Sequence, residues 1–252
     1  MKQNINILDL LGKPTSLYEK FHEKTKIKTK MTLVPRKNWP KAWKEVIFKE
    51  YPRLDNIILP EPSSIDHITL AEVLGERKSS RVFSQSPLTL EELSTLLYYS
   101  AGLRENKRPW IANRFYPSGG GRYPLEVYLI SLNSELPKAV YHYNLRSHSL
   151  ELLIDLKKIN IVEYFNYDFV SGASCIVVIT ACFRRTTIKY KDRGYRFCFM
   201  ECGHLSQNFY LNSSALNIKC CAVAGFVENK LNKLLDIEGV TETVIQTIAL
   251  GK

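Results

Sequence analysis

The chain has 252 residues, of which 45% are hydrophobic and 24% are charged, and this composition excludes a disordered or fibrous protein. No stretch approaches the roughly 20 apolar residues that span a bilayer, and Asp9 interrupts the short apolar run near the N-terminus, so we expect a cytoplasmic protein without a membrane partner. The formal net charge is +10, but no nucleic-acid-binding motif accompanies it, so a nucleic-acid partner is not expected.

The first 62 residues form a basic lead segment. Positions 1–60 hold 13 Lys and Arg residues and 6 acidic residues, which gives this stretch a charge of +7. Prolines at positions 35, 40, 52, 60 and 62 favour an extended strap over a packed pair of helices. We therefore expect an N-terminal extension over residues 1–62, serving as a dimer arm or a docking segment, and a folded domain over residues 63–252.

Two helices are predicted at the start of that domain. Residues Thr69–Arg77 have the apolar spacing of a short helix. Thr89-Leu90-Glu91-Glu92 is a capping box, which predicts a second helix that ends at Gly102. The next residues, 103–124, read as a long loop, and loops of this length inside a folded domain are usually functional.

The remaining elements predict a sheet with helices around it. Cys175–Ala181 is almost entirely apolar, so we expect a central strand that is covered on both faces. The other predicted elements are a strand Leu125–Leu132, a hairpin of Val140–Tyr143 and Leu150–Ile154, a long helix over 195–216, a strand Lys219–Gly225, a helix Glu228–Leu235 and a strand Thr243–Leu250. This order predicts an α+β sandwich with a mixed, mostly antiparallel sheet flanked by helices. Neither a dinucleotide-binding glycine pattern nor a P-loop is present.

The six cysteines lie in the last third of the chain, mostly inside apolar runs. Cys198 and Cys202 are four residues apart and His204 follows, so these three groups could in principle contact a metal ion. Their spacing matches no common zinc pattern, and we interpret the cysteines as buried apolar positions of a helix. No metal is expected.

A basic segment follows the first predicted helix. Arg77, Lys78, Ser79 and Arg81 combine cations with a hydroxyl. An arginine presents a planar fork to phosphate, and a serine adds a hydrogen bond, so the segment is a candidate phosphate site. A solvated basic turn has the same composition and is the alternative.

A glycine-rich segment, Pro117-Ser118-Gly119-Gly120-Gly121, leads through Pro124 into a predicted strand. Consecutive glycines allow the backbone to approach a ligand and to point its N–H groups at it. A flexible loop tip is the alternative, but the flanking prolines and the buried strand favour a fixed loop.

Three further positions are candidates. Lys189 and Tyr190 could supply a base if burial or a neighbouring cation changes their pKa, although an exposed lysine is the simpler interpretation. Gly225 ends a predicted strand, and Lys252 follows the last predicted strand, where a terminal lysine is usually just solvated.

The order and spacing of these segments resemble the SagB-type azoline dehydrogenases, a branch of the FMN-dependent nitroreductase superfamily. The resemblance is carried by residues 77–83 and 87–93, by Pro117–Tyr128 (PSGGGRYPLEVY), by Tyr141-His142-Tyr143, by Lys189-Tyr190, and by residues 193–196 and 201–208. Residues 21–26 and 58–60 of the lead segment are also similar to that branch, so the resemblance covers nearly the whole chain.

The resemblance implies a homodimer with FMN at the subunit interface. By position, Arg77, Lys78 and Ser79 are expected at the FMN phosphate and ribitol, and Arg81 near the pyrimidine edge of the flavin. Pro117, Ser118, Gly119 and Gly120 are expected to line the isoalloxazine, while Gly225 and Lys252 are expected to close the phosphate site. Lys189 and Tyr190 are the implied catalytic residues.

The resemblance also implies a reaction. A thiazoline or oxazoline ring in a ribosomally made peptide would lose its Cα proton to Lys189 or Tyr190 and a hydride to flavin N5, which leaves a thiazole or oxazole. The implied partners are the precursor peptide and a cyclodehydratase complex. Two alternatives stay open: an NAD(P)H-dependent nitro- or quinone reductase on the same fold, and a flavin-free scaffold subunit of a peptide-modifying complex.

Overall fold

The computed structural model describes residues 16–30, 34–104, 113–156 and 159–252. Its contacts divide the chain into two units, Met1–Lys44 and Glu45–Lys252. The N-terminal run that contains Asp9 lies outside the described residues. The strap expected over the lead segment contains helical turns and a strand, so its backbone is more regular than the proline spacing suggested.

The first unit contains short helices. Helix α2 (Leu17–Lys24) begins at Ser16, whose hydroxyl accepts the backbone N–H of Glu19 at 3.3 Å, while the Glu19 carboxylate accepts the N–H of Ser16 at 3.0 Å. This reciprocal capping stabilises the first turn. The turn η1 (Arg36–Asn38) and helix α3 (Lys41–Lys44) follow. The role expected for residues 1–62, as a dimer arm or docking segment, stays a prediction.

A seven-stranded sheet organises the second unit, with strand order β1-β4-β3-β2-β5-β7-β6. The strands are β1 (Asn56–Ile58), β2 (Leu125–Ser131), β3 (Ala139–Asn144), β4 (Ser149–Asp155), β5 (Cys175–Cys182), β6 (Lys219–Val223) and β7 (Glu242–Gly251). All pairings between these strands are antiparallel, and the parallel bridges in the described part of the chain are isolated ones. The predicted α+β class is confirmed, and β1 of the lead segment is the edge strand beside β4.

Strand β5 lies between β2 and β7 and is buried along its first seven residues, as its apolar sequence predicted. Alternate side chains enter different cores: Val177 and Ile179 join one buried cluster, and Ile176 and Val178 join the other. The sheet is therefore covered on both faces, which is the arrangement that a continuous apolar strand requires.

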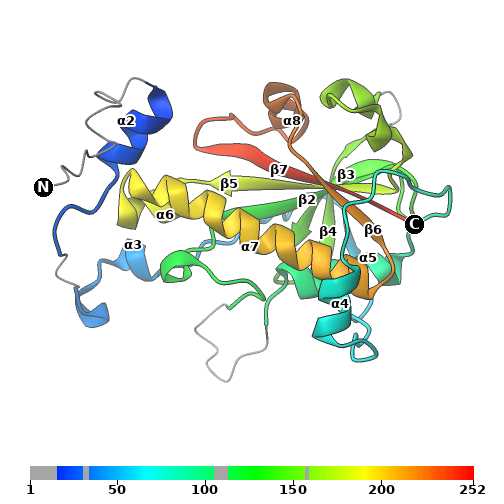
Figure 1. The fold of residues 1–252 in the computed structure, drawn as a ribbon, viewed down its shortest axis with the longest axis horizontal. Helices are drawn as coiled ribbons and strands as arrows, with labels where there is room; N and C mark the ends of the chain where they lie inside the picture. Colours follow the sequence, from blue (N-terminus) through cyan, green and yellow to red (C-terminus); the bar gives the residue numbers. More distant parts are fainter. Residues whose placement is uncertain (1–15, 31–33, 105–112, 157–158) are drawn as a thin grey trace, which may run out of the picture. The chain divides into compact units, whose positions relative to one another are not determined.

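Helices cover both faces (Figure 1). The helices of the second unit are α4 (Leu70–Glu76), α5 (Leu90–Ala101), α6 (Arg184–Tyr190), α7 (Arg193–Ala215) and α8 (Glu228–Leu234), with the 3-10 turns η2 (Gly119–Gly121), η3 (Ile161–Tyr164) and η4 (Asp168–Gly172). Apolar residues of α5 and α7 pack in the first cluster, whereas those of α8, η3 and η4 pack in the second. The long helix α7 crosses one face of the sheet (Figure 1).

Several predicted boundaries need correction. No helix was predicted between the strand Cys175–Ala181 and the long helix, but Arg184–Tyr190 is helical, and α7 begins two residues earlier than expected, at Arg193. Strand β6 ends at Val223 rather than at Gly225. The capping box at Thr89 is confirmed, since its hydroxyl accepts the N–H of Glu92 at 3.1 Å.

Within the residues that the structure describes, none of the helices is both long and apolar enough to cross a membrane.

Candidate functional site

The glycine-rich loop and the Lys189–Tyr190 pair meet in the structure. Gly120 has φ +68°, in the left-handed region that favours glycine, and a Cβ built on it would overlap the phenol oxygen of Tyr190 and lie 3.0 Å from Nζ of Lys189. Segments that are 69 residues apart in the sequence, at 120 and 189, thus form one site. Gly119 and Gly120 are exposed, so the outer side of the loop is open to a ligand.

A tight helix pair places Lys189 and Tyr190 at this loop. Both residues end α6, and α7 begins three positions later. Gly194 allows the two helices to touch, because a Cβ there would lie 3.0 Å from the backbone nitrogen of Thr187. The ring of Tyr190 packs edge-on against Phe197 of α7, with the ring centroids 4.9 Å apart. Phe197 also packs against Gly119, where an added Cβ would lie 3.5 Å from the Phe197 ring.

Arg185 fastens α6 to the residues that follow the loop. Its backbone carbonyl accepts the Nε–H of Arg122 at 2.6 Å, and its Nη1 donates to the carbonyl of Tyr123 at 3.3 Å. Its guanidinium also forms an ion pair with Glu126 of β2, and both side chains are buried. Because Arg185 lies one helical turn before Lys189, these contacts fix the base of the turn that carries the candidate catalytic pair.

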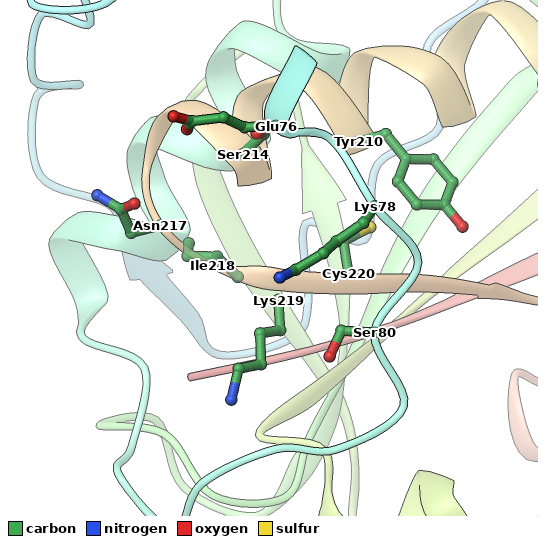
Figure 2. Close-up of a pocket in the computed structure, with 9 residues that line it drawn as sticks. All are labelled: Glu76, Lys78, Ser80, Tyr210, Ser214, Asn217, Ile218, Lys219 and Cys220. Atoms are coloured by element: carbon green, nitrogen blue, oxygen red, sulfur yellow. The ribbon is translucent and has the colours of Figure 1, made fainter. Parts of the chain in front are cut away.

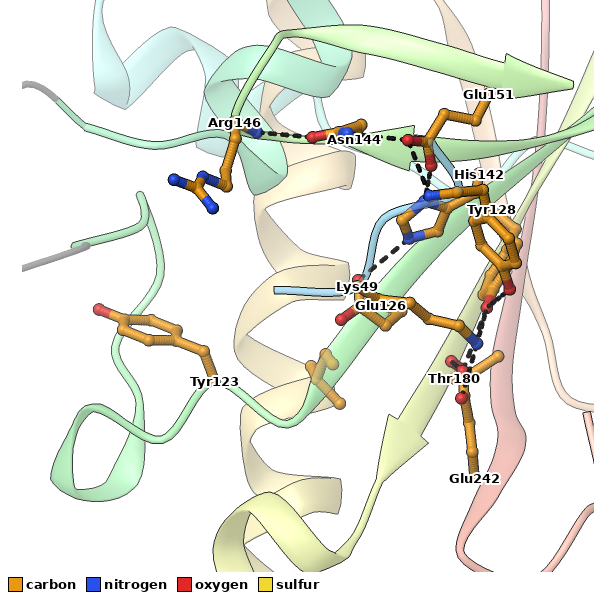
Figure 3. A network of polar contacts seen from close by, with 12 residues as sticks. Lys49, Tyr123, Glu126, Tyr128, His142, Asn144, Arg146, Glu151, Thr180 and Glu242 are labelled. Atoms are coloured by element: carbon orange, nitrogen blue, oxygen red, sulfur yellow. Dashed lines mark hydrogen bonds and ion pairs between the residues drawn. The ribbon is translucent and has the colours of Figure 1, made fainter. Parts of the chain in front are cut away.

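Glu126 belongs to a buried polar network on the sheet (Figure 3). His142 of β3 lies between two carboxylates, with Nε2 3.2 Å from Glu126 Oε2 and Nδ1 2.7 Å from Glu151 Oε2. Burial opposes ionisation, but the hydrogen bond from His142 and the charge of Arg185 lower the pKa of Glu126 to about 2. Burial likewise opposes the charge on His142, but its two carboxylate partners raise its pKa above 6.5. The network therefore alternates positive and negative groups.

A second polar group lies beside it (Figure 3). Lys49 Nζ donates to Glu242 Oε2 at 2.8 Å and to Tyr128 Oη at 2.7 Å, and Thr180 donates to Glu242 Oε1 at 2.8 Å. These contacts join β2, β5 and β7 to the residues that precede β1. They stabilise the end of the sheet from which α6 departs.

Tyr190 is a protonated phenol at neutral pH. Burial raises its pKa above the ordinary value of 10, and the positive charge of Arg122 offsets that rise only in part. The sequence left open whether burial or a neighbouring cation would change the pKa of Tyr190, and in the structure burial decides the direction. One neighbouring cation, Arg185, forms an ion pair with Glu126, so its charge does not lower the pKa of Tyr190.

Glu201 is a site residue that the sequence reasoning missed. It lies on α7 one turn after Phe197, whose ring packs against Gly119, and it is 2% exposed. The Ser118 hydroxyl and the Gly119 N–H lie close enough to act on its pKa. Burial raises the pKa of Glu201 to about 7 against the effect of these donors and of Arg114. It is the one acidic residue of α7, and that isolation in a largely apolar helix was the available signal.

The basic segment contacts the opposite part of α7. Ser80 N–H donates to the carbonyl of Cys220 at 2.9 Å, which docks the segment on β6. The hydroxyl of Ser79 lies 2.9 Å from Oη of Tyr210, and the guanidinium of Arg77 lies 5.4 Å from the centre of the Tyr210 ring. The Tyr210 oxygen also accepts the N–H of Ala222 at 2.8 Å. Tyr210 thus orients Arg77 and Ser79, and no local pattern in the sequence marked it.

Lys78 points elsewhere. It lines a pocket of about 360 Å³ together with Ser80, two residues further along the segment, and Lys219 of β6 (Figure 2). The lining of this pocket includes Lys78, Lys219 and Tyr210 but neither Arg77 nor Ser79. The expected contact of Lys78 with the cofactor phosphate stays a prediction.

The chain end lies beside the basic segment, since Ser84 N–H donates to the carbonyl of Lys252 at 2.7 Å. The Lys252 ammonium forms an ion pair with Glu92. Arg81 is exposed and lies near Cys221: burial raises the pKa of that thiol, and the charge of Arg81 offsets the rise only in part. Gly225 contacts a different residue: a Cβ built on it would lie 2.5 Å from the ring of Tyr167.

The cysteines behave as core residues. Cys198 and Cys202 are buried in the cluster under α7, whereas His204 is exposed on that helix. Among the described residues, no group of three or more His, Cys, Asp or Glu side chains could hold a metal ion.

Comparison with known proteins identifies a family and similar folds. The model of the Nitroreductase family matches residues 74–252. The chain is 33% identical over 177 residues to MJ1384 of Methanocaldococcus jannaschii, which carries a nitroreductase name, covering 69% of this chain and 87% of that protein. It is 31% identical over 143 residues to the microcin B17-processing protein McbC of Escherichia coli, covering 52% of this chain and 51% of McbC. A solved structure of the E. coli microcin synthetase McbBCD complex with truncated pro-MccB17 bound contains a similar chain, with a TM-score of 0.58 and 23% identity over 100% of this chain and 99% of that one.

Proposed function

The chain belongs to the nitroreductase family, and we propose that it is an FMN-dependent dehydrogenase that oxidises thiazoline or oxazoline rings in a ribosomally made peptide. The single observation that carries the proposal is the contact of Gly120 with Lys189 and Tyr190, because it brings a candidate base to an exposed, glycine-lined surface. The similarity to a protein named for microcin B17 processing supports the peptide substrate.

The residues present fit FMN. The exposed glycines at 119 and 120 offer a flat surface without side chains, which suits the approach of an isoalloxazine ring. Arg77 and Ser79 offer a cation and a hydroxyl for the phosphate. The glycine-rich loop lies near Glu201 of α7, and the segment with Arg77 and Ser79 contacts Tyr210 of the same helix. These two helix positions are nine residues apart, which corresponds to about 14 Å along the helix. This spacing suits an elongated cofactor with a ring at one end and an anion at the other.

When bound, FMN supplies the acceptor for the electrons that leave the azoline. A base in this reaction has to be an unprotonated group, and we propose that the amine of Lys189, when neutral, takes the proton from the ring Cα and holds it at Nζ. Tyr190, which keeps its proton at neutral pH, donates a hydrogen bond that orients the ring. The azoline loses two hydrogens in all, one of them as the proton on Lys189. In this proposal Lys189 is the base and Tyr190 is not.

A dimer is also proposed. Tyr195, Phe199 and Met200 are exposed large hydrophobic residues near the start of α7. A surface of this kind favours a protein partner, and a second copy of the chain would cover it. The McbBCD structure, which its name describes as a synthetase complex, supports the further proposal of a cyclodehydratase partner.

The experiment is to incubate the purified, FMN-loaded protein with a thiazoline-containing peptide and to weigh the product. A loss of two hydrogens supports the proposal. The second candidate, an NAD(P)H-dependent nitro- or quinone reductase, is favoured by the similarity to MJ1384. Rapid NAD(P)H oxidation with a nitroaromatic compound and no change in peptide mass would favour that reductase, and a purified protein that takes up no flavin would favour a scaffold subunit.

A further inference from the structure

The carboxyl group of Glu201 is buried directly beneath the residues proposed to hold the flavin ring. Its side chain is 2% exposed, and it lies one turn after Phe197, whose ring packs against Gly119. The hydroxyl of Ser118 and the backbone N–H of Gly119 lie close enough to the carboxyl group to act on its pKa. Ser118 Oγ in turn accepts the N–H of Tyr123 at 2.8 Å, and the Ser118 carbonyl accepts the N–H of Gly121 at 3.0 Å. Through Ser118, one carboxyl group is therefore connected to both ends of the glycine-rich loop.

Polar atoms around this carboxyl are left without partners. Oε1 of Glu201 and both Nε and Nη2 of Arg114 are buried and make no hydrogen bond within the described ranges. Arg114 is 4% exposed and lies close enough to Glu201 to favour its ionised form. Buried polar atoms without partners are uncommon in folded proteins and often mark a functional group.

We propose that Glu201 is a positioning residue that holds the Ser118–Gly119 backbone in its flavin-binding conformation only while its carboxyl group is ionised. This role rests on the proposed FMN site. It adds to that site a residue that acts through the loop and makes cofactor binding depend on pH.

The two protonation states of Glu201 differ in what they offer the loop. The carboxylate only accepts hydrogen bonds, so it can take both the Ser118 O–H and the Gly119 N–H. The protonated acid carries its own O–H donor, which competes with the Ser118 hydroxyl for the same space. Hydrogen bonds to an ionised group are about twice as strong as neutral ones, so protonation loosens the loop.

The groups around Glu201 determine where this change occurs. Burial raises the pKa of Glu201 to about 7, so its protonation changes near neutral pH. Arg114 supplies the neighbouring positive charge. Tyr116, Cys198 and Cys202 are the other titratable groups that interact with it, and burial raises the pKa of each, so they stay neutral in this range.

The test is the affinity of the full chain for FMN, measured by quenching of flavin fluorescence from about pH 5.5 to about pH 8.5. The FMN phosphate itself titrates near a pKa of about 6. The decisive quantity is therefore the ratio of the dissociation constants of the wild type and Glu201→Gln at each pH, because the phosphate contributes equally to both. Riboflavin, which lacks the phosphate, is the second probe. Glu228→Gln, an exposed change on α8, is the matched control.

We expect the two proteins to bind FMN equally at acid pH and the wild type to bind about tenfold more tightly above neutral pH, the size of one charge-assisted hydrogen bond. Riboflavin should show the same trend, and Glu228→Gln should follow the wild type. A ratio that does not change with pH, in a protein that binds FMN, would overturn the role of Glu201 alone. If the wild type binds no FMN at any pH, the proposed function fails as well. If Glu201→Gln does not fold, Ser118→Ala carries the test, and a wild-type pH profile in that variant would overturn the role.

Discussion

The phenol oxygen of Tyr190 occupies the position that a side chain on Gly120 would need. The two residues come from the end of a helix and from a loop more than sixty positions earlier in the chain. Their contact means that the loop and the candidate catalytic pair cannot move independently.

Gly120→Ala should damage the site more than the same change at the next residue. Gly120 and Gly121 both have positive φ, at +68° and +64°, but a Cβ on Gly121 would meet nothing within 4 Å. Each alanine pays the strain of a left-handed backbone, about 1–2 kcal/mol, and only Gly120→Ala also displaces Tyr190. Urea unfolding should show similar losses of stability for both variants, whereas azoline oxidation should fall strongly only in Gly120→Ala. Equal activities would mean that the contact with Tyr190 has no role in catalysis.

Arg77→Ala should weaken FMN binding by about 1.5–3 kcal/mol, because a charge-assisted contact to the phosphate is lost. Lys78→Ala is the matched comparison, since Lys78 faces the pocket of Lys219 instead, and its effect should be clearly smaller. Tyr210→Phe should have an intermediate effect through Ser79 and Arg77. Fluorescence titration with FMN measures all three, and a larger loss in Lys78→Ala than in Arg77→Ala would place the phosphate on the other side of the segment.

The buried network around His142 predicts a stability maximum in mildly acid solution. The pKa of Glu126 falls from 4.5 to about 2 on folding, so its contribution is present above pH 4.5 and is lost as the pH falls toward 2. The pKa of His142 rises above 6.5, so its contribution is complete below pH 6.5 and is lost as the pH rises through the folded value. Urea unfolding at a series of pH values should therefore show the greatest stability between pH 4.5 and 6.5.

Removing one partner of that network should be costly. Glu126→Gln leaves Arg185 and His142 with an uncompensated charge, and the expected loss is about 3–5 kcal/mol. Glu50→Gln, in the exposed pair with Arg146, should cost less than about 1 kcal/mol. If the two variants unfold at similar urea concentrations, the buried ion pair contributes little.

The pKa of Glu201 shifts in the opposite direction to that of Glu126, so its effect on stability has the opposite dependence on pH. Its pKa rises from 4.5 in the unfolded chain to about 7 in the fold, so ionising it destabilises the protein as the pH rises across that interval. The melting temperature of Glu201→Gln, relative to that of the wild type, should therefore be higher at about pH 8 than at about pH 5. Melting curves that shift in parallel with pH would show that Glu201 ionises as easily in the fold as in water.

The sequence predicted those elements whose signal is local. Thr89 and Glu92 form their capping box within one turn, and the apolar run at 175–181 has to be buried on both faces wherever it lies. Helix α6 was missed because RRTTIKY has no apolar face and contains β-branched residues, and its stability comes from packing on α7 at Gly194.

The site was predictable only where residues adjacent in sequence act together. The glycine-rich loop and Lys189–Tyr190 were found as separate segments, but their contact depends on tertiary packing. Tyr210 and Glu201 were not found as site residues, since each acquires its role from a partner far along the chain, Ser79 in one case and Ser118 in the other. The direction of the pKa shift of Tyr190 also depends on tertiary structure, because desolvation outweighs the charge of Arg122.

We expect Lys189 to act as the base and Tyr190 to orient the azoline at an FMN site that neither residue holds. The direct measurement compares the mass of a thiazoline peptide after incubation with wild type, Lys189→Ala, Tyr190→Phe and the double variant, each loaded with FMN, with Arg184→Ala on the exposed side of α6 as the control. Wild type and Arg184→Ala should remove two hydrogens at the same rate, whereas Lys189→Ala and the double variant should keep full flavin occupancy and be slower by about 10² or more, the usual contribution of a positioned base. Near wild-type oxidation by the double variant would contradict the claim.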